Sequence, residues 1–177
     1  MTTNSTPPRR PISMRYNGAD YSDPGVYYIT ICTHHGAHLF GTIHNGRMVT
    51  NQFGDIVWDV WRSLPERFPQ ISIDTAIVMP DHFHGIVIIH EALTKVGETE
   101  ALGIPLTCGE RRKMTLPLIV GYFKMNSAKR LNLQRGTEGS RVWQRNYFDR
   151  ILRDDKDYDD LSEYIFTNPQ RWGIDKD

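Results

Sequence analysis

The sequence has few cysteines and no long apolar segment. Only two of the 177 residues are cysteines, Cys32 and Cys108, and they form no CxxC pair. They cannot build a disulfide framework or a cysteine-based zinc site, so we expect a reducing compartment. No apolar run reaches the roughly 20 residues that a membrane-spanning helix requires. Residues 1–15 lack the apolar stretch of a secretory signal. These absences predict a cytoplasmic protein.

A net charge is missing as well, because 21 Lys and Arg residues balance 21 Asp and Glu residues. The total therefore says nothing about partners, but the distribution is uneven. Residues 111–135 contain seven Lys and Arg residues and no acidic residue, whereas residues 154–177 contain eight acidic and three basic residues. Charge runs of this kind are usually solvated helix faces. The basic run is also typical of a surface that binds a polyanion.

The composition indicates a globular domain, with 39% hydrophobic and 24% charged residues. We expect a flexible basic arm over residues 1–20, where prolines oppose regular structure, and a single domain over residues 21–177. Runs of β-branched and aromatic residues predict strands, and the spacing of apolar residues predicts amphipathic helices. The predicted strands are 26–33, 71–79 and 82–89, and the predicted helices are 53–64, 115–133 and 155–168.

Short polar signals mark the ends of these elements. Asn45-Gly46 predicts a turn, and Asn51 and Asp154 are candidate helix N-caps. Pro169 disfavours continuation of the last helix. Residues 142–152 are expected to be extended in part. The pattern predicts an α+β fold, in which two or three helices pack on a small, mostly antiparallel sheet.

The predicted strand at 82–89 begins with two histidines, His82 and His84, in the segment MPDHFHGIVII. Side chains two positions apart on a strand point to the same face, so the two imidazoles would lie side by side. Such a pair can hold a divalent metal ion, although an isolated H-x-H is more often two ordinary histidines. No carboxylate occurs between Gly85 and Ile89, so a third ligand has to come from a distant segment.

A second segment, SEYIFTNP, contains Tyr164 and Asn168. Asn168 follows Tyr164 by one helical turn, so the two side chains lie on nearly the same side of the helix. The Tyr164 hydroxyl is either a buried hydrogen-bonding group or a nucleophile, since a phenol can attack phosphorus. Asn168 is either a plain helix-terminal residue or a source of an amide oxygen for a metal ion.

Together the two segments, with the blocks GYFKMNSAKRLN and VWQRNYFDRILRD between them, resemble the REP-associated tyrosine transposases. This family is a branch of the single-tyrosine HUH transposases, named for the motif His, bulky hydrophobe, His. The resemblance extends from about Tyr27 to Trp172. It implies the ferredoxin-like fold of HUH endonucleases. It also implies a metal-dependent strand transferase that nicks and rejoins single-stranded DNA through a 5′-phosphotyrosine.

The family's functional positions transfer to four residues of this sequence. The resemblance implies that Tyr164 is the nucleophile and that His82, His84 and Asn168 hold a divalent cation, Mg²⁺ or Mn²⁺. From the chemistry alone, a phosphodiester is anionic and repels a nucleophile, so a metal ion that polarises its non-bridging oxygen favours attack.

Two further tyrosines, Tyr147 and Tyr158, lie near Tyr164 and compete for the role of nucleophile. Only Tyr164 has an amide residue one helical turn later, which favours Tyr164. Many relatives carry histidine where this chain has Asp149, so a role for Asp149 stays open. A loop role is favoured over DNA contact for the histidines after the first strand, His34, His35 and His38.

The expected substrate is single-stranded DNA that forms a REP-like hairpin, because a single tyrosine must meet a flexible, unpaired strand. Basic side chains that contact its phosphates would provide affinity and register rather than sequence recognition. The protein would then be nucleoid-associated, without membrane contact, and a monomer or a homodimer. The basic residues expected to contact DNA are Arg15, Arg111, Arg112, Lys124, Lys129 and Arg130.

Two other functions fit parts of the pattern. A non-catalytic binder of structured nucleic acid, derived from a transposase, would keep the fold, but the tyrosine, histidine and asparagine positions are all intact here. A metallohydrolase that uses the H-x-H pair with water as nucleophile would lack the usual nearby carboxylate. No GxxxxGK[ST] phosphate loop occurs, so no ATP requirement is expected.

Overall fold

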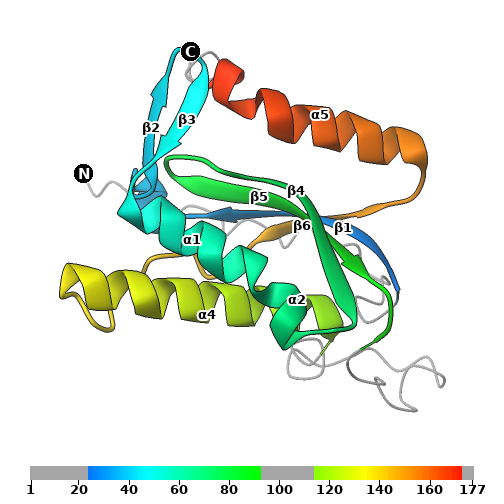
Figure 1. Cartoon of the computed structure of the whole chain (residues 1–177), viewed down its shortest axis with the longest axis horizontal. Coiled ribbons are helices and arrows are strands. Elements are labelled where there is room, and N and C mark those ends of the chain that lie inside the picture. Colours follow the sequence, from blue (N-terminus) through cyan, green and yellow to red (C-terminus); the bar gives the residue numbers. More distant parts are fainter. Residues whose placement is uncertain (1–23, 93–113, 173–177) are drawn as a thin grey trace, which may run out of the picture.

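The computed structural model describes residues 24–92 and 114–172, and the arm expected at residues 1–20 lies outside them (Figure 1). In the described part of the chain, no helix has both the length and the apolar character needed to cross a membrane. The elements along the chain are β1 (Gly25–Cys32), the 3₁₀ turn η1 (His34–Gly36), β2 (Gly41–His44), β3 (Arg47–Thr50), α1 (Gln52–Arg62), α2 (Leu64–Arg67), β4 (Ile71–Val78), β5 (His82–Ile89), α4 (Thr115–Arg135), β6 (Phe148–Leu152) and α5 (Asp155–Arg171).

Four strands form the central sheet in the order β4-β5-β1-β6, and every neighbouring pair is antiparallel. The strands β2 and β3 form a separate hairpin. Without this hairpin and the short turns, the chain order up to β6 is β-α-β-β-α-β, with β5 inserted between β1 and β4. This is the ferredoxin-like arrangement. The expected α+β class with an antiparallel sheet is confirmed.

One face of the sheet is covered by α1 and α4 and holds the main apolar core (Figure 1). Phe83 of β5 is fully buried there, with its ring centroid 4.8 Å from that of Trp61 and 4.9 Å from that of Phe123. A Cβ on neighbouring Gly85 would come within 2.8 Å of the Trp61 ring, so only glycine lets the helix approach the strand this closely. Burial of these large apolar side chains stabilises the packing of α1 and α4 on the sheet.

The opposite face of the sheet is covered by α5 (Figure 1). Its apolar cluster is smaller, with Tyr28, Ile86, Leu152 and Ile165 as the buried members. Because side chains alternate along a strand, Thr30 lies on the same face as Tyr28. For the same reason His82 and His84 lie on the same face as Ile86. The candidate site lies on this face, beyond the end of the apolar cluster.

Several predicted element ends are confirmed. The Asn51 side chain accepts hydrogen bonds from two backbone N–H groups at the start of α1. The Asp154 side chain accepts one from the first turn of α5. Asn45 and Gly46 have φ values of 50° and 69°, as expected for the two central residues of a tight hairpin turn.

Other predicted ends are wrong. The sequence predicts that the last helix stops before Pro169, but α5 continues through this proline to Arg171. A proline in the last turn removes one backbone N–H donor, and the buried ring packs against the protein. Leu64 begins the separate helix α2, and α4 extends to Arg135. By contrast, the expectation that residues 142–152 are extended in part is confirmed, because Phe148–Leu152 forms β6.

Candidate metal and nucleophile site

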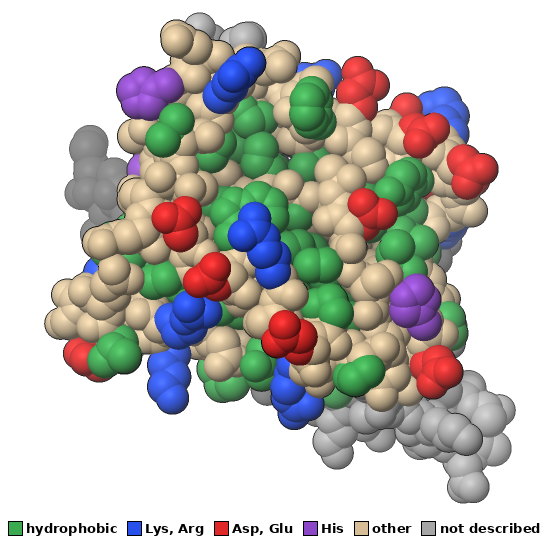
Figure 2. Space-filling model, viewed as in Figure 1, with side chains coloured by type: hydrophobic (Ala, Val, Ile, Leu, Met, Phe, Trp, Pro, Cys, Tyr) green, Lys and Arg blue, Asp and Glu red, His purple; other side chains and the backbone are tan. Residues whose placement is uncertain are grey.

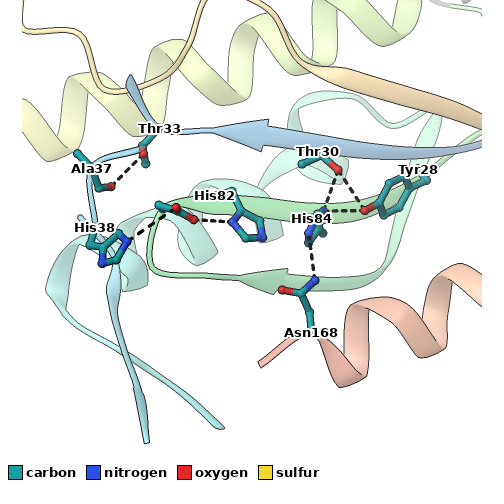
Figure 3. A network of polar contacts seen from close by, with 9 residues as sticks. Tyr28, Thr30, Thr33, Ala37, His38, His82, His84 and Asn168 are labelled. Atoms are coloured by element: carbon teal, nitrogen blue, oxygen red, sulfur yellow. Dashed lines mark hydrogen bonds and ion pairs between the residues drawn. The ribbon is translucent and has the colours of Figure 1, made fainter. Parts of the chain in front are cut away.

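His82 and His84 lie side by side at the start of β5, on the face that α5 covers (Figure 3). Their ring centroids are 4.5 Å apart, and the ring planes meet at 71°. The residue between them, Phe83, points into the core on the other face. Strand alternation therefore pairs the imidazoles as the sequence predicts.

The ring of His84 is held from its Nδ1 side by two hydroxyl groups of β1. Its Nδ1 is 2.7 Å from the Tyr28 hydroxyl and 2.8 Å from the Thr30 hydroxyl. The β1–β5 register accounts for this contact, because Thr30 lies directly opposite His84. Burial, and then the nearby imidazole of His82, lower the pKa of His84 to about 3. His84 is therefore neutral at physiological pH.

His82 is oriented by a carboxylate instead. Its Nδ1 lies 2.6 Å from Oδ1 of Asp81. A carboxylate only accepts hydrogen bonds, so when His82 is neutral its Nδ1 carries the proton and its Nε2 keeps a lone pair. The Trp172 ring is 5.9 Å from the His82 ring. One nitrogen of His82 is thus available as a metal ligand.

α5 brings Asn168 and Tyr164 to the same place. Asn168 is buried, and its side-chain nitrogen lies 3.5 Å from Nε2 of His84 (Figure 3). The Tyr164 ring centroid is 5.5 Å from that of His84, in an edge-to-face arrangement. The structure thus brings together all four residues that the sequence proposes for the metal ion and the nucleophile.

The other candidate tyrosines lie in different surroundings. The Tyr158 hydroxyl donates a hydrogen bond of 2.6 Å to Asp74, which raises the pKa of Tyr158. Tyr147 packs against the core between the sheet and α4. Asp149 lies opposite Ile29, whose side chain belongs to that same core, so Asp149 faces away from the histidines.

The basic residues proposed for DNA binding are not gathered at this site. Arg15, Arg111 and Arg112 lie outside the described residues. The other three are on α4, across the sheet from α5 (Figure 1). Basic and acidic side chains are interspersed over the face shown in Figure 2. The remaining candidates are Lys124, Lys129 and Arg130.

These three side chains of α4 differ in their contacts. The Lys124 ammonium donates hydrogen bonds to the backbone carbonyls of Gln144 and Arg145, at 2.7 and 2.9 Å. Arg130 forms an ion pair of 3.1 Å with Asp59. Lys129 is exposed. Lys124 therefore has a clear structural role, whereas Lys129 presents its charge to solvent.

A pocket of about 400 Å³ lies between the β2–β3 hairpin and the end of α5, and its lining residue Trp172 is the one whose ring lies 5.9 Å from that of His82. Trp172 and His38 line it, and their ring centroids are 5.5 Å apart. His38 Nε2 is also 3.9 Å from Asp81. The rings of His34 and His35 in η1 instead contact each other, with centroids 3.8 Å apart and planes tilted by 37°. Of the three histidines after β1, only His38 reaches the rim of the site.

The sequence prediction omitted the groups that orient the imidazoles: Tyr28, Thr30 and Asp81. Asp81 directly precedes His82, so its proximity is a local signal that the sequence contains. Tyr28 and Thr30 are separated from His84 by 56 and 54 positions. Their role depends on strand pairing, which the residue pattern alone does not reveal. Within residues 24–92 and 114–172, no cluster of three or more His, Cys, Asp or Glu side chains is placed to hold a metal ion.

Comparison with known proteins gives one extensive sequence match, and no family model matches the chain. An uncharacterized protein from Haemophilus influenzae is 36% identical over 165 residues, which cover 93% of this chain and 91% of the relative. The solved structure of a REP-associated tyrosine transposase bound to a REP hairpin aligns with a TM-score of 0.49 and 17% identity, over 85% of this chain and 69% of that chain. A candidate transposase from Deinococcus radiodurans aligns with a TM-score of 0.47 and 16% identity, over 85% of this chain and 95% of that chain.

Proposed function

This chain belongs to the same protein family as the uncharacterized Haemophilus influenzae protein, and we propose that it is a transposase-like DNA strand transferase. In this proposal Tyr164 is the nucleophile, and His82, His84 and Asn168 hold a divalent cation. The observation that carries the proposal is that β5 and α5 bring these four side chains together, although His84 and Asn168 are 84 positions apart in the sequence. The sequence resemblance to REP-associated tyrosine transposases adds the substrate class.

The side chains present fit a divalent cation. Each imidazole has its Nδ1 next to an oxygen, which is the arrangement that orients metal-binding histidines. The lowered pKa keeps His84 neutral, as a ligand must be. Rotation of the Asn168 amide by half a turn would direct its oxygen, rather than its nitrogen, toward His84 Nε2. An amide oxygen suits Mn²⁺ or Mg²⁺, and the imidazole nitrogens would also accept Zn²⁺ or Ni²⁺. When bound, the cation would polarise a non-bridging oxygen of the substrate phosphate.

Tyr164 is the best placed of the tyrosines to attack phosphorus. Among the described residues no side chain forms a hydrogen bond with its hydroxyl, whereas Asp74 binds the Tyr158 hydroxyl and His84 contacts the Tyr28 hydroxyl. Burial also raises the pKa of Tyr28, so its phenol stays protonated. The Tyr164 oxygen is thus the phenol oxygen left for chemistry on this face.

The reaction conserves the energy of the phosphodiester bond. As the bond between the Tyr164 oxygen and phosphorus forms, the bond from phosphorus to the 3′-oxygen of DNA breaks. The phenol proton passes to solvent, and the leaving 3′-oxygen takes up a proton. One DNA end becomes a 5′-phosphotyrosine and the other a free 3′-hydroxyl. Attack of a different 3′-hydroxyl on the phosphotyrosine rejoins the strands, so the cycle needs no ATP.

The proposed substrate is an unpaired DNA strand beside a hairpin. An unpaired strand can bend so that its phosphate reaches the tyrosine, whereas duplex DNA holds its phosphates in a fixed path. The pocket is lined by Trp172, whose ring lies 5.9 Å from that of His82, and it offers aromatic surface of the kind on which unpaired bases stack. This placement supports a single-stranded substrate.

The test uses denaturing electrophoresis after the protein is mixed with Mn²⁺ and a labelled hairpin that carries a single-stranded flank. We expect a covalent protein–DNA band from the wild type and from the control variant Tyr158→Phe. In Tyr164→Phe the adduct should fall by at least about 10³-fold, because the nucleophilic oxygen is lost. Hairpin affinity should stay nearly unchanged.

Three outcomes would overturn the proposal. A persistent adduct in Tyr164→Phe, or one that forms in EDTA, would refute the nucleophile or the metal requirement. Hairpin binding by the wild type without any adduct would indicate a non-catalytic binder of structured nucleic acid. DNA cleavage without an adduct would indicate a metallohydrolase.

A further inference from the structure

Arg171 extends the stripe of site residues along α5. It follows Tyr164 by seven positions and Asn168 by three, so all three side chains lie on one side of the helix. The Arg171 guanidinium carbon is 5.9 Å from the centroid of the Tyr164 ring. α5 places this cation there because it continues through Pro169. A positive charge thus lies against the side chain proposed to attack phosphate.

The charge of Arg171 is not neutralised by the described part of the protein. No carboxylate within residues 24–92 and 114–172 forms an ion pair with it, and no side chain there accepts a hydrogen bond from it. By contrast, Arg150 pairs with Asp157 and Arg130 pairs with Asp59. Arg171 is also exposed to solvent. Its donors are therefore available to an anion that approaches Tyr164.

We propose that Arg171 binds the phosphate that Tyr164 attacks, which makes it a further catalytic residue of the site. This inference rests on the proposed function and adds a residue to it. The planar guanidinium can donate two parallel hydrogen bonds to phosphate oxygens. Negative charge on these oxygens increases as the Tyr164 oxygen attacks, so a guanidinium that binds them more strongly in the transition state both binds and activates the phosphate.

A simpler role for Arg171 is stabilisation of the helix end. A cation in the last turn of a helix interacts favourably with the helix dipole. That role requires no contact with DNA. If it is the only role, replacing Arg171 changes the stability of the protein and leaves the affinity for DNA phosphates unchanged. The two roles therefore differ in whether loss of Arg171 changes phosphate binding.

Arg67 provides a matched control. Its guanidinium carbon also lies 5.9 Å from a tyrosine ring, that of Tyr122, and 5.2 Å from the ring of Phe68. Arg67 belongs to α2, and Tyr122 belongs to α4 on the other face of the sheet. Arg67→Ala thus removes the same kind of cation–aromatic contact at a distance from the site.

The first measurement is the rate of adduct formation in a single turnover with the labelled hairpin and Mn²⁺. We expect Arg171→Ala to slow this rate by about 10²- to 10³-fold, whereas Arg67→Ala leaves it unchanged. Arg171→Lys should recover part of the rate, because lysine supplies charge without the planar pair of donors. Equal rates for Arg171→Ala and the wild type would refute the proposal.

The second measurement does not depend on catalysis. In a Tyr164→Phe background, affinity for a short unpaired oligonucleotide is measured against salt concentration in EDTA. Loss of one phosphate contact should reduce the slope of log affinity against log salt by about 0.7. An unchanged slope in Arg171→Ala would overturn the phosphate contact even if the wild type formed no adduct. A reduced slope without any wild-type adduct would support the contact and refute the strand-transfer function.

Discussion

Phe83 and His84 are sequence neighbours on β5 that point into opposite layers of the molecule. Phe83 is fully buried against the rings of Trp61 and Phe123. His84 is almost as buried, with 4% exposure, but its neighbours are two hydroxyls and an amide. The degree of burial is thus similar, and the chemistry of the surroundings differs.

This contrast separates the main apolar core from the candidate site. The core between the sheet, α1 and α4 is apolar and closely packed, so it tolerates little change in volume. The layer beneath α5 has a smaller apolar cluster and ends in the polar side chains of His82, His84 and Asn168 (Figure 3). A single sheet therefore carries a closely packed apolar core on one face and the candidate site on the other.

The strongest test of the contrast compares substitutions at the two neighbours. Phe83→Ala should lower the free energy of unfolding by about 3–5 kcal/mol, because it leaves a cavity in the core. His84→Gln should cost less than about 2 kcal/mol, since it removes hydrogen bonds rather than volume. Urea denaturation of both variants measures the difference.

For metal binding, the substitution of His84 should have a larger effect than the substitution of Phe83. In a titration with Mn²⁺, His84→Gln should lower the affinity by about 100-fold or more. The folded fraction of Phe83→Ala, and the milder variant Phe83→Leu, should bind Mn²⁺ with unchanged affinity. Undiminished Mn²⁺ binding by His84→Gln would refute the assignment of this face to the metal ion. Strong destabilisation by His84→Gln alone would refute the separation of roles.

Acidic pH should lower the stability of the protein through His84, on the face that α5 covers. The pKa of His84 is about 3 in the folded protein and about 6.5 when unfolded. Between these values the unfolded chain binds a proton that the folded chain does not, so stability is lost as pH falls through this window. The loss approaches about 1.4 kcal/mol per pH unit.

Urea midpoints measured in EDTA between neutral pH and about pH 5 check this expectation. His84→Gln should flatten the dependence on pH, because the group that titrates is absent. His44→Gln is a suitable control, since His44 is exposed on the hairpin. An unaltered pH dependence in His84→Gln would show that other groups cause the acid sensitivity.

Local patterns predicted the residues of both faces more successfully than their contacts. The alternation around His82 and His84 and the one-turn spacing of Tyr164 and Asn168 require only the geometry of one strand and one helix. Both predictions of local placement are confirmed by the ring and amide distances. The fold class followed from the same kind of local information.

Contacts between distant segments were not predicted. Tyr28 reaches His84 because β1 pairs with β5 in one register, and this register depends on the packing of whole strands. Pro169 was expected to end the last helix, but its buried position in α5 outweighs the lost N–H. Arg171 was therefore absent from the predicted site. In both cases tertiary packing overrides the local signal.

Tyr28 provides a smaller test, again with a sequence neighbour on the other face as control. Tyr28→Phe removes one of the two hydroxyls at His84 Nδ1, so Mn²⁺ affinity should fall by about 10-fold. Tyr27→Phe changes a side chain of the opposite core and should leave Mn²⁺ affinity unchanged. Equal affinities in the two variants would show that Thr30 alone orients the imidazole.

The smallest expected effect concerns the basic side chains of α4, which lie across the sheet from Tyr164. Lys129 is exposed, so if it contacts one DNA phosphate, Lys129→Ala should reduce the slope of log hairpin affinity against log salt by roughly 0.7 to 0.9.

The other two basic side chains of α4 should change this slope less. Lys124→Ala should mainly lower the free energy of unfolding, by about 1 kcal/mol, because the Lys124 ammonium donates hydrogen bonds to two backbone carbonyls. Arg130 already pairs with Asp59, so Arg130→Ala should change the slope less than Lys129→Ala. Salt titrations of the three variants with a labelled hairpin measure these differences. Three unchanged slopes would exclude α4 from the DNA-binding surface and leave phosphate binding to the α5 side of the sheet.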